Sequence, residues 1–301
     1  MSLFYNLNVP HLRRSGAQVA ATMALHRDSG QFDVLALNCA VQVSAGAPLA
    51  AGALACIAAF DASLHDATTI AQRVTRFAVP TKSVLRRITV QLSDLRQLHD
   101  LALLADVMAQ CDLVALQPTD ERTLRGACCD SDCVDLVALD LTQRLPFAFK
   151  FSTLSVALAR DIFFEIDVAP LLSPTADAHT RGNVLAQAVS LVRVTKGRNI
   201  VLTCSASTRA ELRLASDIIN VARVIGLTDE QAHASMTHAA ARCVRRGHFR
   251  ATTRSFGVME IRERTPADDA AFGVDDDDFE DDDDDDDDDG DTGLAQGQFI
   301  L

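Results

Sequence analysis

Short apolar segments recur along this chain and alternate with stretches that have the residue spacing of helices. Segments that run apolar along their whole length and are separated by helices indicate a mostly parallel sheet with both faces covered. Eight segments are predicted to be strands, at residues 3–9, 32–38, 84–92, 112–117, 134–139, 154–159, 162–168 and 199–203. Seven stretches are predicted to be helices, at residues 16–28, 63–73, 95–109, 120–128, 177–194, 212–225 and 229–246.

Eight strands of this kind over about 250 residues fit a closed α/β barrel of the TIM-like (β/α) type. An open, doubly wound sheet is the alternative. The turn after the first strand lacks a glycine-rich phosphate-binding sequence, which disfavours a dinucleotide-binding version of that open sheet. Residues 1–264 are therefore predicted to form one barrel domain.

Capping residues mark several of the predicted helix ends. Asp94 is a suitable N-cap for the helix that follows it, and Thr119 can cap the next one. Thr228 opens a capping box, and Lys196-Gly197 is expected to end the helix before the last strand. The segment 142–153, which contains Pro146, is predicted to be a loop. The apolar segment 45–59 is too short to cross a bilayer and is predicted to enter a buried helix, so no membrane partner is expected.

An acidic tail accounts for the net charge of −13. No Lys or Arg follows Arg264, whereas 17 acidic residues lie between Asp268 and Asp291. Removing those 17 from the 41 acidic residues leaves 24, against 28 basic residues. Residues 265–301 cannot bury apolar area and are predicted to be a disordered Asp-rich tail on a mildly basic domain.

The eight cysteines are scattered, and the chain opens without the charged and apolar segments of a secretory signal, so reduced thiols are expected. Cys128, Cys129 and Cys133 offer at most three zinc ligands without a second cysteine pair, and they are predicted to be a buried helix end instead. His233 and His238 are five residues apart, which misses the spacing that places two ligands on one helix face, so both are predicted to be exposed.

The carboxyl ends of the predicted strands, where barrel enzymes carry their reactive groups, have no histidine. They offer Asn8, Asn38, Gln117, Asp140, Asp161, Asp167 and Ser205. A metal-dependent phosphoesterase needs clustered histidines and carboxylates, and Asn6-Leu7-Asn8 stands where a His-x-His pair would be expected. Asp140, Asp161 and Asp167 could still hold one Mg²⁺ or act as acid and base, which keeps such an enzyme as the alternative.

Arginine dominates the basic residues, with 25 Arg against three Lys. Arginine binds phosphate through a bidentate fork, although a coding bias could also enrich it. The basic residues cluster at Lys196-Gly197-Arg198, at Arg209 and Arg213, and in a C-terminal group of Arg242, Arg245, Arg246, His248, Arg250 and Arg254. Contact with RNA phosphate is one interpretation, and stabilisation of helix C-termini is the other.

Several blocks of the sequence resemble one known family. They are Arg86 to Val90, Leu145 to Lys150, Ile162 to Ile166, Lys196 to Ala206, and the stretch from Glu211 to Thr228. In this order and spacing they resemble the thirty-kilodalton protein subunit of ribonuclease P and RNase MRP. The resemblance covers about residues 3–260 and leaves out the acidic tail.

The resemblance implies a barrel that is related to metal-dependent phosphoesterases but has lost their metal site, with no catalytic residue and no cofactor. It implies a non-catalytic subunit that supports a catalytic RNA in removing the 5′ leader of precursor tRNA, and in ribosomal RNA processing as part of RNase MRP. The implied partners are ribonuclease P RNA, RNase MRP RNA, a small ferredoxin-like subunit and other holoenzyme proteins. The implied location is the nucleus and its nucleolus.

On this hypothesis, six basic residues are expected to neutralise RNA phosphates without reading base sequence. They are Lys150, Arg160, Lys196, Arg198, Arg209 and Arg213. A further alternative is an interaction factor whose acidic tail binds basic nuclear proteins.

Overall fold

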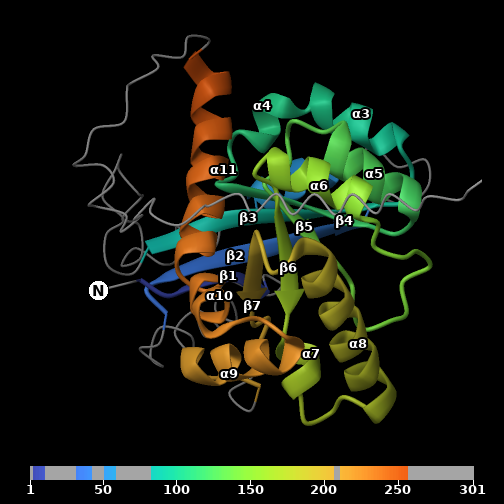
Figure 1. Cartoon of the computed structure of the whole chain (residues 1–301). Coiled ribbons are helices and arrows are strands. Elements are labelled where there is room, and N and C mark those ends of the chain that lie inside the picture. The colour runs from blue at the N-terminus through green and yellow to red at the C-terminus, as the bar shows by residue number, and fades with distance from the viewer. Residues whose placement is uncertain (1–2, 11–31, 43–50, 59–82, 207–210, 257–301) are drawn as a thin grey trace, which may run out of the picture. The chain divides into compact units, whose positions relative to one another are not determined.

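The computed structural model describes residues 3–10, 32–42, 51–58, 83–206 and 211–256. Within them, seven strands form one sheet in chain order, and every neighbouring pair is parallel (Figure 1). The strands are β1 (Tyr5–Pro10), β2 (Val34–Gln42), β3 (Ser83–Leu92), β4 (Leu113–Pro118), β5 (Leu136–Ala138), β6 (Phe163–Asp167) and β7 (Ile200–Thr203).

Helices cover the outside of this sheet and one end of it (Figure 1). They are α3 (Arg96–Leu103), α4 (Ala105–Met108), α5 (Glu121–Cys129), α6 (Phe151–Ala159), α7 (Ala169–Leu172), α8 (Ala178–Thr195), α9 (Ala215–Ile225), α10 (Asp229–Ala234) and α11 (His238–Phe256), and a further helix covers residues 51–58. In the described part of the chain, no helix is both long enough and apolar enough to span a bilayer.

The fully buried side chain of Asn6 joins the two edges of the sheet. Its Nδ2 donates to the backbone oxygen of Cys204, just after β7, at 2.9 Å, and its Oδ1 accepts from the Cys204 N–H at 3.2 Å. One amide side chain therefore satisfies backbone groups that would otherwise be unpaired at a sheet edge. The sheet is a nearly closed TIM-like barrel, which confirms the predicted fold class.

Strand residues alternate between the barrel interior and the helical layer. The interior has its own apolar cluster, which contains Tyr5, Leu7, Val34, Ala36, Leu85, Leu113, Ala115, Leu136, Ala138, Phe163 and Val201. Their neighbours, such as Leu35 and Phe164, pack under the helices instead. Ala240 and Cys243 of α11 belong to the interior cluster, so α11 covers the end of the barrel where the strands begin.

Helix α11 lies very close to the barrel at Gly247. A Cβ atom there would lie 2.1 Å from the backbone oxygen of Asp112, which cannot rotate away as a side chain could. Gly247→Ala is therefore expected to lower the free energy of unfolding by about 1–3 kcal/mol, measured by urea denaturation. Gly182→Ala in α8 is the control, because it meets nothing within 4 Å and should be neutral or stabilising. Equal effects of the two substitutions would contradict the close approach.

The predicted strand at 154–159 is wrong, because these residues lie in helix α6. Strands β5 and β6 pair in parallel, so the chain between them must cross from one end of the barrel to the other, and a helix makes that crossover. Within α6, Leu154 and Ala157 are buried, which is the spacing of a helix face rather than of a strand. The predicted helices at 16–28 and 63–73 and the predicted tail at 265–301 lie outside the described residues.

Two of the four predicted helix ends are confirmed, and two predicted caps are displaced by one residue. Thr228 caps α10 in a capping box with Gln231, and Lys196 ends α8 in the left-handed conformation, as predicted. The cap of α5 is Asp120 rather than Thr119, whose hydroxyl donates to the backbone oxygen of Leu92. Helix α3 begins at Arg96 with Leu95 as its N-cap, so the prediction of Asp94 as the N-cap is wrong, and the Asp94 carboxylate accepts the Arg96 N–H instead.

Reduced cysteines were expected throughout, and this is wrong for Cys39 and Cys56, which form a disulfide. Cys39 lies in β2 and Cys56 lies in the helix at 51–58, with 6.0 Å between their Cα atoms. The packing of that helix on β2 brings together two thiols whose distance along the sequence gave no sign of pairing.

Candidate functional site

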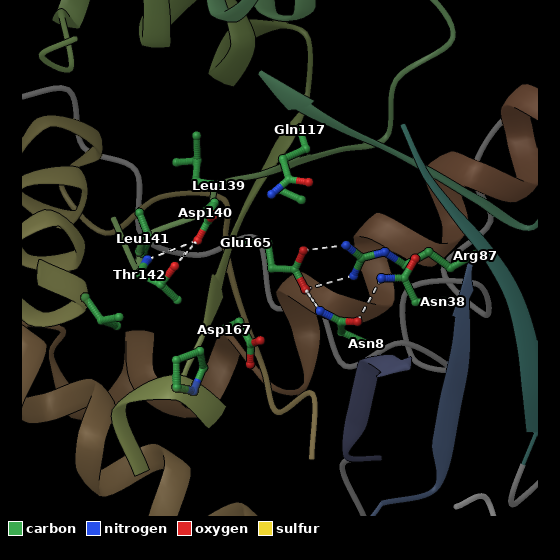
Figure 2. A pocket seen from close by; sticks show the side chains of 13 residues that line it. Asn8, Asn38, Arg87, Gln117, Leu139, Asp140, Leu141, Thr142, Glu165 and Asp167 are labelled. Atoms are coloured by element: carbon green, nitrogen blue, oxygen red, sulfur yellow. Dashed lines mark hydrogen bonds and ion pairs between the residues drawn. The ribbon is translucent and has the colours of Figure 1, made fainter. Parts of the chain in front are cut away.

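The carboxyl ends of the strands surround a cavity of about 150 Å³ (Figure 2). It is lined by Asn8, Asn38, Arg87, Gln117, Ala138, Leu139, Asp140, Leu141, Thr142, Glu165, Asp167, Pro170 and Val184. Barrel enzymes place their chemistry at this end, so these residues decide whether this chain can be one.

An ion pair between Arg87 of β3 and Glu165 of β6 fills the base of this cavity. The Arg87 guanidinium contacts both carboxylate oxygens of Glu165, and its Nη1 also donates to the backbone oxygen of Leu7 at 2.8 Å. The two side chains are only 1% and 3% exposed. A planar guanidinium that faces a carboxylate in this bidentate manner makes one of the stronger side-chain contacts found in proteins.

A ring of amides and hydroxyls completes the hydrogen bonding around Glu165. Its Oε1 accepts from Asn8 Nδ2 at 3.0 Å and from the Thr203 hydroxyl at 2.7 Å. Asn8 Oδ1 accepts from Asn38 Nδ2 at 2.9 Å, and Asn38 Oδ1 accepts from the Thr89 hydroxyl at 2.7 Å. This network satisfies buried polar groups on five strands, β1, β2, β3, β6 and β7.

Asn8 reaches the cavity because β1 contains an irregularity. The register with β2 shifts between Asn6 and Val9, so two residues of β1 face one residue of β2. Leu7 points into the apolar interior, and the extra residue turns the Asn8 side chain inward as well. Bulges of this kind re-aim side chains at barrel rims, and simple alternation along the strand does not predict them.

The contacts of Glu165 make its carboxylate unavailable as a ligand for a catalytic metal. Its carboxylate charge is neutralised by Arg87, and the fixed positive guanidinium repels a divalent cation at the same place. Among the residues that the structure describes, no group of three or more His, Cys, Asp and Glu side chains could hold a metal ion. The phosphoesterase alternative therefore has no support in the geometry of the cavity.

The three aspartates proposed for that alternative do not form one site. Asp140 binds within its own turn, where it accepts the N–H of Thr142 at 3.1 Å. Asp167 accepts the backbone N–H groups of Ala169 and Ser205 at 3.0 and 3.1 Å. Asp161 comes just before β6 and so lies at the opposite end of the barrel, because the predicted strand at 154–159 is helix α6.

The raised pKa of Asp167 gives a testable pH dependence. Burial, the largest cause, raises the pKa of this carboxyl from 3.8 to about 6, and the negative charge of Glu165 adds to the rise. The folded state binds the Asp167 proton more tightly than the unfolded state does. The protonated carboxyl therefore adds to the free energy of unfolding below pH 3.8, and this contribution is lost as the pH rises through about 6.

Asp167→Asn is therefore expected to be more stable than the parent chain at pH 7, and this advantage should shrink towards pH 4. Urea denaturation at pH 4, 5, 6 and 7 measures it. Asp140→Asn is the control, because that carboxylate is exposed. A constant difference between Asp167→Asn and the parent chain across this range would contradict the assignment.

The cysteines that suggested zinc lie at the end of α5. Cys128 and Cys133 are buried, and Cys129 is partly buried. Burial raises the pKa of Cys128 to about 12, which disfavours the thiolate that zinc requires. The predicted buried helix end is confirmed, as is the exposure of His233 and His238.

The five described residues among the six expected to bind RNA are divided between the two ends of the barrel. Arg160, Lys196 and Arg198 lie where β6 and β7 begin, whereas Lys150 and Arg213 lie at the cavity end, before α6 and α9. Lys150 pairs with Glu121, and Arg213 donates to the backbone oxygen of Leu172 at 3.1 Å. Arg209 lies outside the described residues.

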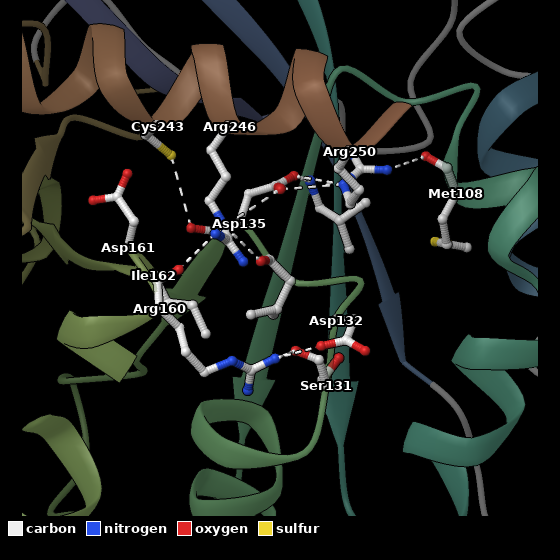
Figure 3. Close-up of polar contacts among 12 residues, drawn as sticks. Met108, Ser131, Asp132, Asp135, Arg160, Asp161, Ile162, Cys243, Arg246 and Arg250 are labelled. Atoms are coloured by element: carbon white, nitrogen blue, oxygen red, sulfur yellow. Dashed lines mark hydrogen bonds and ion pairs between the residues drawn. The ribbon is translucent and has the colours of Figure 1, made fainter. Parts of the chain in front are cut away.

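Two arginines of the C-terminal group, Arg246 and Arg250, point towards the barrel (Figure 3), whereas the side chain of Arg242 is 45% exposed. Arg250 donates from Nε to both oxygens of buried Asp135, at 3.1 and 3.0 Å, and from its two terminal nitrogens to backbone oxygens. Arg246 donates to the backbone oxygens of Val134 and Arg160, and Arg242 pairs with Asp161. Helical spacing places all three on one side of α11, so the interpretation of Arg246 and Arg250 as phosphate ligands is wrong.

The structure also reveals charged residues that sequence reasoning missed. Arg87, Asp135 and Glu165 are buried but were not singled out as site residues. Glu165 follows Phe163-Phe164 inside an apolar strand, and Arg87 lies inside β3. A charged residue within an apolar strand is the signal that could have found them, because a buried charge needs a partner.

Comparisons with known proteins relate this chain to one family. The family model RNase P subunit p30 matches residues 3–252. A probable ribonuclease P protein subunit 3 of Schizosaccharomyces pombe is 35% identical over 153 residues, which cover 51% of this chain and 62% of that protein. The ribonuclease P protein subunit p30 of Mus musculus is 29% identical over 194 residues, which cover 64% of this chain and 70% of that protein.

A solved structure shares the fold. One chain of an archaeal ribonuclease P with mature tRNA matches with a TM-score of 0.59 at 12% identity, covering 86% of this chain and 97% of that chain. At this identity the likeness concerns the fold alone. The family model covers most of the chain, and the resemblance seen in the sequence blocks is confirmed. The chain belongs to the RNase P subunit p30 family.

Proposed function

We propose that this chain is a non-catalytic protein subunit of ribonuclease P, which supports the RNA of the complex during removal of the 5′ leader from precursor tRNA. The observation that carries the non-catalytic part is the Arg87–Glu165 pair, which occupies the cavity base where a barrel enzyme would hold its reactive groups. Family membership and the names of the relatives support the choice of complex.

The partners of such a subunit are ribonuclease P RNA and the other proteins of the holoenzyme, including a small ferredoxin-like subunit. We extend the proposal to RNase MRP RNA, to ribosomal RNA processing and to a nuclear, nucleolar location. The excess of arginine in residues 1–264 is compatible with RNA as the main partner.

Affinity purification of the tagged full-length chain from its own cells tests the complex. Sequencing of the co-purified RNA should recover ribonuclease P RNA, and the eluate should cleave precursor tRNA. RNase MRP RNA in the same eluate would support the extension. Purification at low salt without structured RNA would overturn the proposal.

The non-catalytic role is tested by comparing the cleavage rates of holoenzymes with and without a substitution in the cavity. Asp140→Asn removes an exposed carboxylate from the cavity, and its holoenzyme should cleave precursor tRNA at the rate of the unsubstituted complex. A loss of about 100-fold or more, with normal RNA recovery, would instead indicate acid–base chemistry in the protein.

A further inference from the structure

We infer that the end of the barrel where the strands begin carries a docking surface for RNA phosphates, formed by Arg193, Lys196, Arg198 and Arg242. We call these four residues the basic turn surface. The inference rests on the proposed function, because it identifies which part of the chain faces the RNA of the complex.

The C-terminus of α8, the turn before β7 and helix α11 bring the four cations to the same end of the barrel. The turn before β7 is tied to the turn before β6 by Asn199, whose Nδ2 donates to Asp161 Oδ1 at 3.4 Å and to the Ile162 backbone oxygen at 3.3 Å. Arg242 of α11 reaches the same place, since it pairs with Asp161 and its guanidinium lies 5.6 Å from the ring centre of Phe163. Figure 3 shows Asp161 beside α11 at this end.

Backbone strain is concentrated in these two turns. Asp161, Lys196 and Asn199 have φ angles of 56°, 53° and 51°, and they are the positive-φ residues other than glycine in the described part of the chain. Lysine at the residue that ends α8 is unfavourable, because glycine is the usual residue in this left-handed position. Strain retained at such a position points to a use for the lysine side chain outside the fold.

Three of the four cations of this surface are available to a partner, whereas Arg242 is paired with Asp161. Arg193, Lys196 and Arg198 are exposed, and within the described residues their side chains have no hydrogen-bond or ion-pair partner. The nearby carboxylates of Asp161 and Asp132 are already paired with arginines. Among the other expected RNA ligands at the cavity end, Lys150 and Arg213 are engaged within the chain. Charge complementarity therefore favours a polyanion at the basic turn surface.

Stabilisation of a helix C-terminus explains only some of the cations in the basic turn surface. Arg193 and Lys196 lie at the C-terminus of α8, where positive charge is favourable for any helix. Arg198 lies beyond the helix in the turn, and Arg242 belongs to another helix, so the helix dipole of α8 does not account for them. Rigid turns with exposed cations suit contacts to the phosphate backbone, which position RNA without reading its bases.

The test compares two full-length triple variants of equal charge. Arg193→Gln/Lys196→Gln/Arg198→Gln removes three cations of the basic turn surface. Arg122→Gln/Arg125→Gln/Arg144→Gln removes three exposed cations from α5 and from the loop before α6, and serves as the matched control. Each protein is titrated with ribonuclease P RNA of its source organism over a series of KCl concentrations, and the binding constant is plotted against salt on logarithmic axes.

The first triple variant is expected to reduce the slope of that plot by about 2–3, since each lost phosphate contact reduces it by about 0.7–0.9. The control should leave the slope nearly unchanged. Equal reductions in both variants, or a reduction in the control alone, would overturn the inference. If the unsubstituted chain neither binds nor co-purifies with this RNA, the proposed function itself fails.

Lys196→Gly separates RNA binding from helix stability. Glycine adopts the left-handed conformation without steric strain, so this variant should keep or raise the melting temperature of the protein while it weakens RNA binding. A lower melting temperature with unchanged RNA binding would show that the lysine serves the helix alone, and would remove it from the basic turn surface.

Discussion

Arg87→Met is expected to lower the free energy of unfolding by about 3–5 kcal/mol, because it leaves the Glu165 carboxylate buried without its charge partner. Glu165 is 3% exposed at its side chain, and its remaining donors, Asn8 and Thr203, are neutral. The backbone oxygen of Leu7 also loses a donor. Urea denaturation with circular dichroism measures the change.

The double variant Arg87→Met/Glu165→Gln is the control. Glutamine keeps an oxygen that can accept from Asn8 and Thr203 but carries no charge, so the double variant should recover more than half of the lost stability. The single variant Glu165→Gln, which leaves Arg87 unpaired, should be destabilised like Arg87→Met. If Arg87→Met alone is neutral, the pair does not organise the barrel as described.

Arg250→Met should have an effect of similar size, about 3–5 kcal/mol, at the other end of the barrel. Its Nε donates to fully buried Asp135, and its terminal nitrogens donate to the backbone oxygens of Met108 and Cys111 at 3.0 Å. Loss of these bonds removes the main polar attachment of α11, so amide protons of α11 should exchange faster with solvent than those of β3.

The pH dependence of the stability lost in Arg250→Met tests whether the unpaired charge of Asp135 causes the loss. Burial raises the pKa of Asp135, and the positive charge of Arg250 opposes that rise. Without Arg250 the carboxyl takes up a proton more readily, so the deficit should be smaller at pH 5 than at pH 8. Arg250→Met/Asp135→Asn should recover stability at pH 8. His248→Gln, an exposed change on the same helix, should stay within about 0.5 kcal/mol of the parent chain.

Local patterns in the sequence were sufficient for most of the architecture. The apolar strand segments and their alternation with helices predicted all seven described strands within a few residues of their observed bounds. Apolar periodicity and capping residues act within a few neighbouring residues, so they stabilise a strand or helix regardless of where it lies in the fold. Asn6-Leu7-Asn8 likewise indicated from the first strand that a metal-binding histidine pair is missing.

The segment 154–159 is an element whose type the local sequence pattern did not predict correctly. Its apolar residues suit a strand or a buried helix equally, and the choice is made by the need to cross from β5 to β6. Nothing within the segment itself carries that information.

The sequence by itself therefore determined the barrel, its family and the absence of histidine at the strand ends. Only the tertiary structure decided which charges meet. Arg87 pairs with Glu165 across 78 residues, and Asp135 pairs with Arg250 across 115 residues. Closing the sheet sets these pairs opposite each other and divides the basic residues between two ends of the barrel. Such contacts depend on the position of each strand around the barrel, which no local pattern of residues encodes.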